Sequence, residues 1–122
     1  LIEGAHEGAG LGDRFLGHVE RCNVLLHLVD VTADDPVASY GIVRDELAAY
    51  GHGLAEKPEI LCLNKCDALD QAAIARKRRA LARAAGRPVH AVSGATRMGL
   101  DAVLAEALRH VRERRQQRAT AA

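Results

Sequence analysis

The stretch ILCLNKCD, residues 60–67, is an apolar run that stops abruptly at an amide, an ammonium and a carboxylate. A short apolar run bounded by polar residues is typical of a strand buried on both faces of a parallel sheet. Asn64, Lys65 and Asp67 follow that strand directly, and ligands of open parallel sheets bind beyond the carboxyl ends of the strands. The stretch therefore predicts a parallel sheet with a binding site at its carboxyl edge.

Apolar runs and helical patterns alternate along the rest of the chain. Asp35 before Pro36 is a helix start signal, and Gly51 and Gly86 are stop signals. The alternation predicts an α/β fold, with a parallel sheet and flanking helices, made of about three strands and four helices. We expect strands at residues 24–31, 59–63 and 88–92, and helices at about 13–21, 36–50, 70–85 and from about 100 onward.

The last expected helix carries the most regular apolar stripe of the sequence. This stripe predicts one buried face, made of Leu100, Val103, Leu104, Ala107, Leu108 and Val111. Residues 112–122 lose the stripe, and we expect this end of the helix to fray.

Composition sets limits on the class of protein. The 122 residues suffice for one domain, and with 48% hydrophobic but only 2% aromatic residues the core must be aliphatic. A net charge of +1 gives no argument for DNA or membrane binding, and no apolar run approaches the ~20 residues of a membrane span. Three cysteines, an odd number, predict reduced thiols and a cytoplasmic protein. The opening residues, LIEGAHEGAG, suggest a piece of a longer protein.

The carboxylate of Asp67 suits one purine in particular. It can accept two parallel hydrogen bonds from the ring N–H and the exocyclic amine of guanine, whereas adenine offers no such pair. Sites built on buried polar groups of this kind reject the wrong analogue by roughly 10⁴–10⁵-fold. We expect Asn64 to tie neighbouring loops together and Lys65 to lay its aliphatic stem along the base. The alternative is a strand followed by a turn or helix cap that merely contains an aspartate.

Ser93, Gly94 and Ala95 end the third expected strand. Their backbone N–H groups are suited to the O6 oxygen of guanine and would refuse adenine, which carries an amine there. The alternative is an ordinary turn before the last helix.

Three other features carry weaker signals. The glycine-rich stretch at residues 8–13 lacks a preceding strand within the chain, which favours a flexible hinge over a phosphate cradle. Asp30 ends a strand, where it serves either a turn or a function. The six histidines and three cysteines lack zinc-ligand spacing, so no metal site is predicted.

The first thirty residues, LIEGAHEGAGLGDRFLGHVERCNVLLHLVD, resemble the Obg family of GTPases. LNKCD at 63–67 and VSGAT at 92–96 fall where that family carries its fourth and fifth guanine-nucleotide motifs. The resemblance covers essentially the whole chain. It implies the second half of a Ras-like G domain with the P-loop NTPase fold. Residues 1–21 would be its switch II region, 22–118 its guanine-recognition half and 119–122 a tail.

The resemblance also implies GTP and GDP as ligands and Mg²⁺ as cofactor, with the Mg²⁺ and phosphate ligands outside this fragment. No catalytic residue is expected within the fragment, because Leu1 occupies the position of a water-orienting glutamine. The fragment alone should be inactive. The implied GTP-binding residues are Asn64, Lys65, Asp67, Ser93, Gly94 and Ala95. The implied switch residues are Leu1, Ile2, Glu3, Gly4, Gly8, Gly10 and Gly12.

For the intact protein, the resemblance implies GTP hydrolysis to GDP and phosphate in the cytoplasm, in large ribosomal subunit assembly and stress response. The arginine-rich stretches at 76–83 and 112–118 would be solvated helix faces or, if the family is a guide, ribosomal RNA contacts. Two alternatives stay open. One is an Era-like or HflX-like GTPase, and the other is an interaction module that keeps the fold without binding nucleotide.

Overall fold

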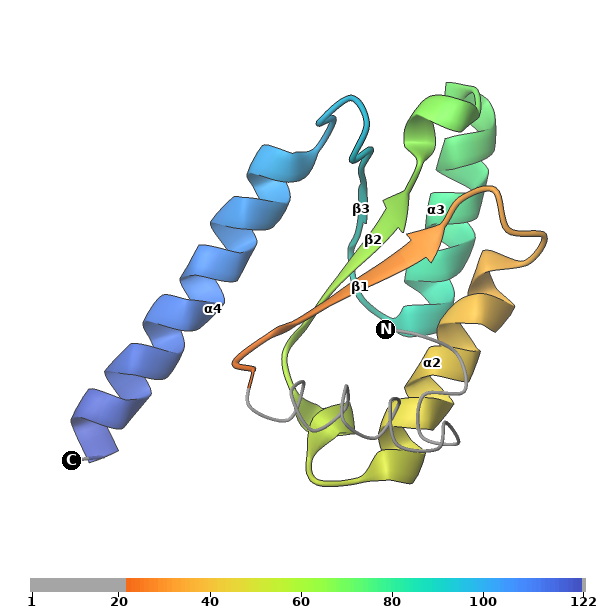
Figure 1. Ribbon diagram of the computed structural model, residues 1–122. Helices are drawn as coiled ribbons and strands as arrows, with labels where there is room; N and C mark the ends of the chain where they lie inside the picture. Colours follow the sequence, from red (N-terminus) through yellow and green to blue (C-terminus); the bar gives the residue numbers. More distant parts are fainter. Residues whose placement is uncertain (1–21, 122) are drawn as a thin grey trace.

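The structure is a computed structural model that describes residues 22–121, with side chains described to residue 117. The expected helix at 13–21 and the expected switch residues, Leu1 to Gly12, lie outside the described residues. The described part contains three strands, three α-helices and two short 3₁₀ turns, in the order expected for an α/β fold (Figure 1).

The sheet is parallel and ordered β1-β2-β3, with β2 in the centre. Its strands are β1 (Leu25–Asp30), β2 (Glu59–Asn64) and β3 (Val89–Ala91). Asp30 lies opposite Asn64, and Leu63 lies opposite Ala91. The three carboxyl ends therefore meet at one edge of the sheet, as the sequence predicts.

Helices cover both faces of the sheet. The helices α2 (Pro36–Tyr50) and α3 (Gln71–Ala85) pack together on one face, and α4 (Leu100–Ala121) lies on the other (Figure 1). Two 3₁₀ turns, η1 (Leu54–Glu56) and η2 (Cys66–Ala68), flank β2. Successive side chains of β2 point to opposite faces of the sheet and are buried on both. Leu61 and Leu63 pack in the core on the α2–α3 side, whereas Ile60 and Cys62 pack near Val103 of α4.

The helix boundaries follow the local signals of the sequence. Asp35 accepts a hydrogen bond from the Ala38 N–H at 3.1 Å, and Asp70 accepts one from the Ala73 N–H at 2.7 Å. Each bond satisfies a donor that the first helical turn leaves unpaired, which stabilises a helix by about 1 kcal/mol. Gly86 ends α3 in the left-handed conformation, with φ of 68°.

The apolar face of α4 is only partly buried, which corrects the sequence prediction. Val103 is buried, but Leu104 and Leu108 are 60% and 54% exposed. The reason is that α4 packs on the sheet through Leu100, Val103 and Ala107, which join the cluster of Ile60, Cys62 and Val92, so that Leu104 and Leu108 lie outside this contact. On β1, Leu26 and Leu28 are likewise exposed.

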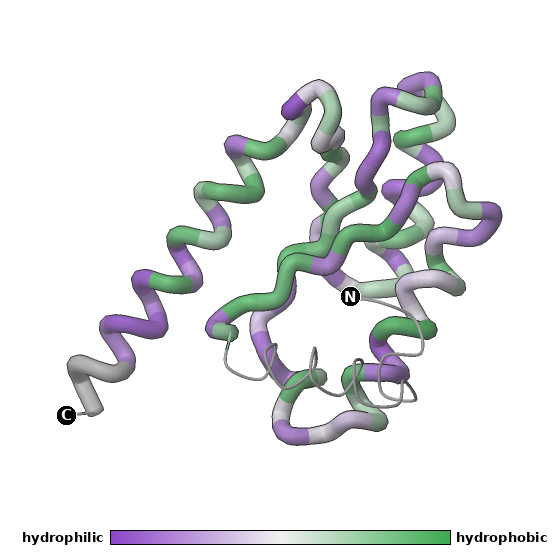
Figure 2. Tube along the Cα trace, viewed as in Figure 1, coloured by the Kyte–Doolittle hydropathy of each residue, from purple (hydrophilic) through white to green (hydrophobic). Residues whose placement is uncertain are grey.

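The end of α4 also differs from the expectation. The helix continues to Ala121 instead of fraying where its apolar stripe ends, and Figure 2 shows this second half as mostly hydrophilic. Among the described residues, no helix combines the length and apolar character that crossing a membrane would require.

Candidate functional site

The loops after β2 and β3 are joined at the carboxyl edge of the sheet. The Val92 N–H donates to the Leu63 carbonyl at 2.8 Å, and the Cys66 N–H donates to the Val92 carbonyl at 3.1 Å. The ladder between the two strands thus continues beyond their ends. It holds residues 64–67 beside residues 93–95, as the alternation of strands and helices predicts.

Asp67 is held by a hydrogen bond from the neighbouring loop. The Ser93 hydroxyl donates to Asp67 Oδ1 at 2.7 Å and accepts from the Thr96 N–H at 3.2 Å. Ser93 is fully buried, whereas Asp67 is exposed. A carboxylate offers about four lone-pair positions, so this bond orients Asp67 and leaves acceptor capacity at both oxygens. Asp67 is therefore an oriented, solvent-exposed hydrogen-bond acceptor at the carboxyl edge of the sheet.

Asn64 joins the same two loops. The Gly94 N–H donates to Asn64 Oδ1 at 3.4 Å, a long and therefore weak hydrogen bond. This contact matches the expected tying role of the amide.

The backbone donors of the second loop are mostly committed. The Ser93 N–H donates to the Met98 carbonyl at 3.0 Å, and the Gly94 N–H is taken by Asn64. Within residues 22–121, no acceptor is paired with the Ala95 N–H. The sequence prediction assigned all three amides to one ligand oxygen. In the structure, the Ser93 N–H is bonded within the protein and the Gly94 N–H makes only a weak bond, whereas the Ala95 N–H has no described acceptor.

Lys65 has an unusual backbone and a specific side-chain partner. Its φ of 65° lies in the left-handed region, which residues other than glycine seldom adopt. Its ammonium Nζ lies 2.9 Å from Asp30 Oδ2, at the end of the neighbouring strand. No local pattern in the sequence predicts this pair, because it joins residues 35 positions apart.

Asp30 combines the two roles that the sequence left open. Its Oδ1 accepts from the Thr32 N–H at 2.8 Å and from the Thr32 hydroxyl at 2.6 Å, which makes a turn, while Oδ2 faces Lys65. The hydrogen bond from the Thr32 hydroxyl, followed by that from Lys65, lowers the pKa of Asp30 to about 2. Asp30 is therefore ionised throughout the physiological range.

Gly99 closes the loop that carries Ser93 and Ala95. Its φ is 74°, and a Cβ there would collide with the Ala91 carbonyl oxygen. Only glycine combines this conformation with so close an approach. Gly99 was not among the predicted residues, although a glycine directly before a helical pattern is a visible signal of such a turn.

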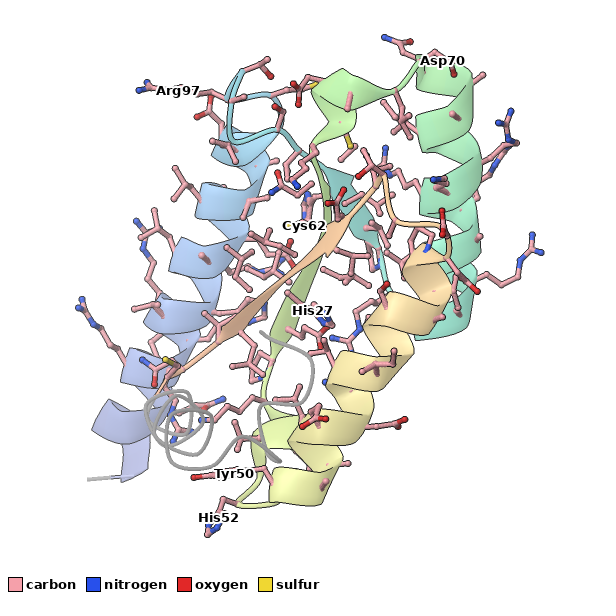
Figure 3. All side chains as sticks on the ribbon, turned by 45° about the vertical axis from the view of Figure 1, so that its right-hand side comes forward. His27, Tyr50, His52, Cys62, Asp70 and Arg97 are labelled. Carbon is pink, nitrogen blue, oxygen red and sulfur yellow. The ribbon has the colours of Figure 1, made fainter. Side chains whose placement is uncertain are left out.

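A second polar cluster lies at the other end of β2, and we call it the buried cluster: His27, Arg44, Glu59 and Arg87. Glu59 Oε1 is 3.0 Å from His27 Nδ1, and Arg44 Nη1 donates to Glu59 Oε2 at 2.6 Å. Arg87 Nη1 lies 3.8 Å from Glu59 Oε2. His27 also stacks on Tyr40, with ring centroids 5.2 Å apart, and Figure 3 shows it between the sheet and α2.

The charge of Glu59 is stabilised despite its burial. Burial alone would raise its pKa, but the hydrogen bond from His27 and the charges of His27, Arg44 and Arg87 together lower it below the ordinary value. Glu59 and Asn64 are opposite ends of one six-residue strand, about 16 Å apart at ~3.3 Å per residue. The buried cluster is thus separate from the carboxyl edge.

Cys62, in β2, and Cys66, in η2, are both buried. Burial raises the pKa of Cys62 to about 11 and also raises that of Cys66. Burial therefore disfavours the thiolate form, which is the nucleophile, at both positions. In the part of the chain that the structure describes, no three histidine, cysteine or acidic side chains are grouped as a metal site.

No protein-family model matches the chain, but several curated proteins that share one name are similar to it. GTPase Obg of Acidiphilium cryptum is 59% identical over 116 residues, which is 95% of this chain and 35% of that protein. GTPase Obg of Rhizorhabdus wittichii is 61% identical, and that of Zymomonas mobilis is 56% identical, each over 104 residues, or 85% of this chain and 30% of theirs. The chain thus spans about a third of the length of the curated relatives that it matches.

Proposed function

Because the chain is a segment of an Obg-family protein, we propose that it is the guanine-recognition part of a GTP-binding domain. The whole protein binds GTP and hydrolyses it to GDP and phosphate. Two observations support this proposal. The relatives are named GTPases, and the carboxyl edge of this sheet has donors and acceptors that suit guanine.

The observation that carries the proposal is the hydrogen bond from the buried Ser93 hydroxyl to Asp67. It fixes an exposed carboxylate before any ligand arrives. The remaining lone pairs of Asp67 accept the ring N–H and the exocyclic amine of guanine. Adenine has no donor pair at that edge, so its binding would leave the carboxylate desolvated and unpaired, which carries a large penalty.

The neighbouring residues complete the recognition of the base. The Ala95 N–H donates to guanine O6, while Ser93 and Gly94 hold the loop through their own bonds. Lys65 covers the base with its aliphatic stem, and Asn64 keeps the two loops in register. Each group has a partner in the base or a partner that positions it.

Hydrolysis depends on parts of the protein beyond this site. When bound, Mg²⁺ neutralises phosphate charge, and its ligands belong to sequence that this chain does not contain. Residues 1–21 form the switch II region, whose Leu1, Ile2, Glu3, Gly4, Gly8, Gly10 and Gly12 respond to the γ-phosphate. Residues 22–118 form the guanine-recognition half, and 119–122 form a tail. Leu1 has no polar group with which to orient water, so this segment does not hydrolyse GTP by itself.

The cellular role follows from family resemblance alone. It is a cytoplasmic role with the large ribosomal subunit as partner, in subunit assembly and stress response. The Era-like and HflX-like alternatives are disfavoured, because relatives at 56–61% identity are all named GTPase Obg.

The proposal is tested by titrating the full-length protein with fluorescent GDP and with the matching ADP derivative. GDP should bind more tightly by a factor that approaches the roughly 10⁴–10⁵ of hydrogen-bonding sites. Equal affinity for the two, or no binding of either, would favour the nucleotide-independent interaction module and contradict the proposal.

A further inference from the structure

The contact between Asp30 and Lys65 links β1 to the proposed base site. Asp30 lies opposite Asn64 in the parallel register, so the next residue of the second loop, Lys65, comes within its reach. The lysine Nζ and the carboxylate Oδ2 are 2.9 Å apart. This contact therefore depends on the pairing of two strands and not on local sequence.

The carboxylate of Asp30 is itself fixed. Thr32 donates to Oδ1 from both its backbone N–H and its hydroxyl, at 2.8 and 2.6 Å. These two bonds hold the carboxylate plane, so that Oδ2 is presented to Lys65. Since the pKa of Asp30 is about 2, its charge is constant wherever the protein is folded at physiological pH.

Lys65 is held from its backbone as well. It occupies the left-handed region, and its carbonyl accepts from the Ala68 N–H at 2.9 Å. A free lysine side chain has four rotatable bonds and loses much conformational entropy when it is ordered. The contact with Asp30 orders that side chain before a ligand binds.

Stability does not explain the contact. The side chains of Lys65 and Asp30 are 62% and 39% exposed, and ion pairs this exposed contribute little to folding. Preorganising a group that borders a ligand, by contrast, lowers the entropic cost of binding.

We propose that Asp30 is a positioning residue that acts through Lys65: it holds the lysine stem at the base site and so tightens guanine-nucleotide binding. The inference rests on the proposed function, since it needs a base against which the stem lies. Asp30 does not touch the nucleotide, and Thr32 supports it from behind.

The test measures the affinity of the full-length protein for GDP, with Asp30→Asn as the main variant. Asparagine keeps an oxygen for the two Thr32 bonds but loses the charge and turns an amine toward Lys65. We expect GDP to bind about two- to fivefold more weakly, the size of effect that an exposed ion pair can supply. Asp34→Asn is the matched control, because Asp34 is an exposed acid of the same loop without a described partner. It should leave the affinity unchanged.

A double-mutant cycle separates positioning from a merely structural role. In a Lys65→Met background, Asp30→Asn should have no further effect on GDP affinity, because the group through which it acts is gone. Thr32→Ala is a second variant that keeps both charges and the backbone bond to Asp30 Oδ1 but removes the bond from the hydroxyl, so it loosens the carboxylate without freeing it. It should weaken GDP binding less than Asp30→Asn does.

Two outcomes would overturn the inference while leaving guanine recognition intact. One is an Asp30→Asn effect equal to that of Asp34→Asn. The other is an Asp30→Asn effect of the same size with and without Lys65, which would mean that Asp30 only shapes the turn. If the unmodified protein did not prefer GDP to ADP, the proposed function itself would fail, and this inference with it.

Discussion

Each end of β2 carries a polar cluster in which a carboxylate is bonded to a residue distant in sequence. The two clusters differ in how many hydrogen-bonding positions they leave unused. At the Glu59 end, one carboxylate with a fully buried side chain meets His27, Arg44 and Arg87. At the Asn64 end, one exposed carboxylate, Asp67, meets only Ser93 among the described residues. Both clusters join distant segments, 32 residues apart for His27 and Glu59 and 26 apart for Ser93 and Asp67.

The difference shows how a binding edge can be distinguished from a structural network. In the buried cluster, both oxygens of Glu59 are engaged, and among the buried side-chain nitrogens and oxygens that the structure describes, Arg87 Nε is the one without a hydrogen-bond partner. At the carboxyl edge, Asp67 has acceptor positions that no described group fills, and the Ala95 N–H is a donor without a described acceptor. A buried network with its bonds made stabilises the fold. An oriented but incompletely bonded group is available to a ligand.

The largest expected effect concerns Asp67→Ala. It removes the acceptor pair for guanine, so the preference for GDP over ADP should collapse toward parity, a loss of roughly 10⁴-fold. Competition binding on the full-length protein measures this ratio. Asp45→Ala, the same change on the exposed surface of α2, should leave the ratio intact. If the preference for GDP over ADP survived the loss of Asp67, the Asn64 end of β2 could not be distinguished from the Glu59 end as the binding end.

Glu59→Ala should have the opposite profile. It leaves the buried His27 and the part-buried Arg44 without their carboxylate, and removing one partner of a buried charge network costs up to about 3–5 kcal/mol of stability. Urea unfolding of the same protein measures the loss. The ratio of GDP to ADP affinity should not change in the fraction that remains folded. Glu56→Ala, at an exposed position of η1, should have little effect on either quantity.

The buried cluster should also give the stability an acid dependence. Because the pKa of Glu59 is lowered on folding, its contribution is present above the ordinary glutamate pKa of about 4.3. That contribution is lost as the pH falls through the folded-state value. The unfolding midpoint should therefore fall on acidification below about pH 4 more steeply in the unmodified protein than in Glu59→Gln. Equal slopes would show that Glu59 is not ionised in the folded state.

Gly99→Ala should give a smaller effect that links stability to binding. The new Cβ would meet the Ala91 carbonyl in a backbone region unfavourable for alanine, a strain of about 1–3 kcal/mol. The loop that holds Ser93 and Ala95 must shift, so GDP binding should weaken. Gly94→Ala is the control for stability, since a Cβ there meets nothing within 4 Å. Thermal unfolding and GDP titration of both variants test this pair.

The smallest effect concerns the cysteines. Cys22 is exposed, whereas Cys62 and Cys66 are buried and have raised pKa values. At pH 8 a thiol reagent should modify Cys22 readily and the other two only on unfolding. Peptide mapping after brief labelling measures this. Rapid labelling of Cys66 would mean that solvent and reagent reach the interior beneath the carboxyl edge, which contradicts the burial of Cys66.

The sequence predicted those features that depend on local signals. Asp35 and Asp70 cap helices, and Gly86 ends one, because each acts within one turn of its own position. The approach of Asp67 to Ser93 also followed, since the ends of adjacent parallel strands must meet.

The features that were missed depend on register and packing. Glu59 lies opposite Leu25, and the contact with His27 two residues further along depends on that alignment, which no local pattern specifies. The pairing of Asp30 with Lys65 has the same origin. The apolar stripe of α4 correctly predicted a helix, but it did not reveal how much of the stripe the sheet would cover, because coverage depends on where the helix crosses.

The most direct test of guanine recognition is the nucleotide preference of the Asp67→Asn variant of the full-length protein. Xanthine carries an oxygen where guanine has its exocyclic amine, and an asparagine amide can donate to that oxygen. If Asp67 reads the base, xanthosine diphosphate should bind this variant more tightly than GDP, in reverse of the unmodified protein. A variant that still preferred GDP would contradict the account.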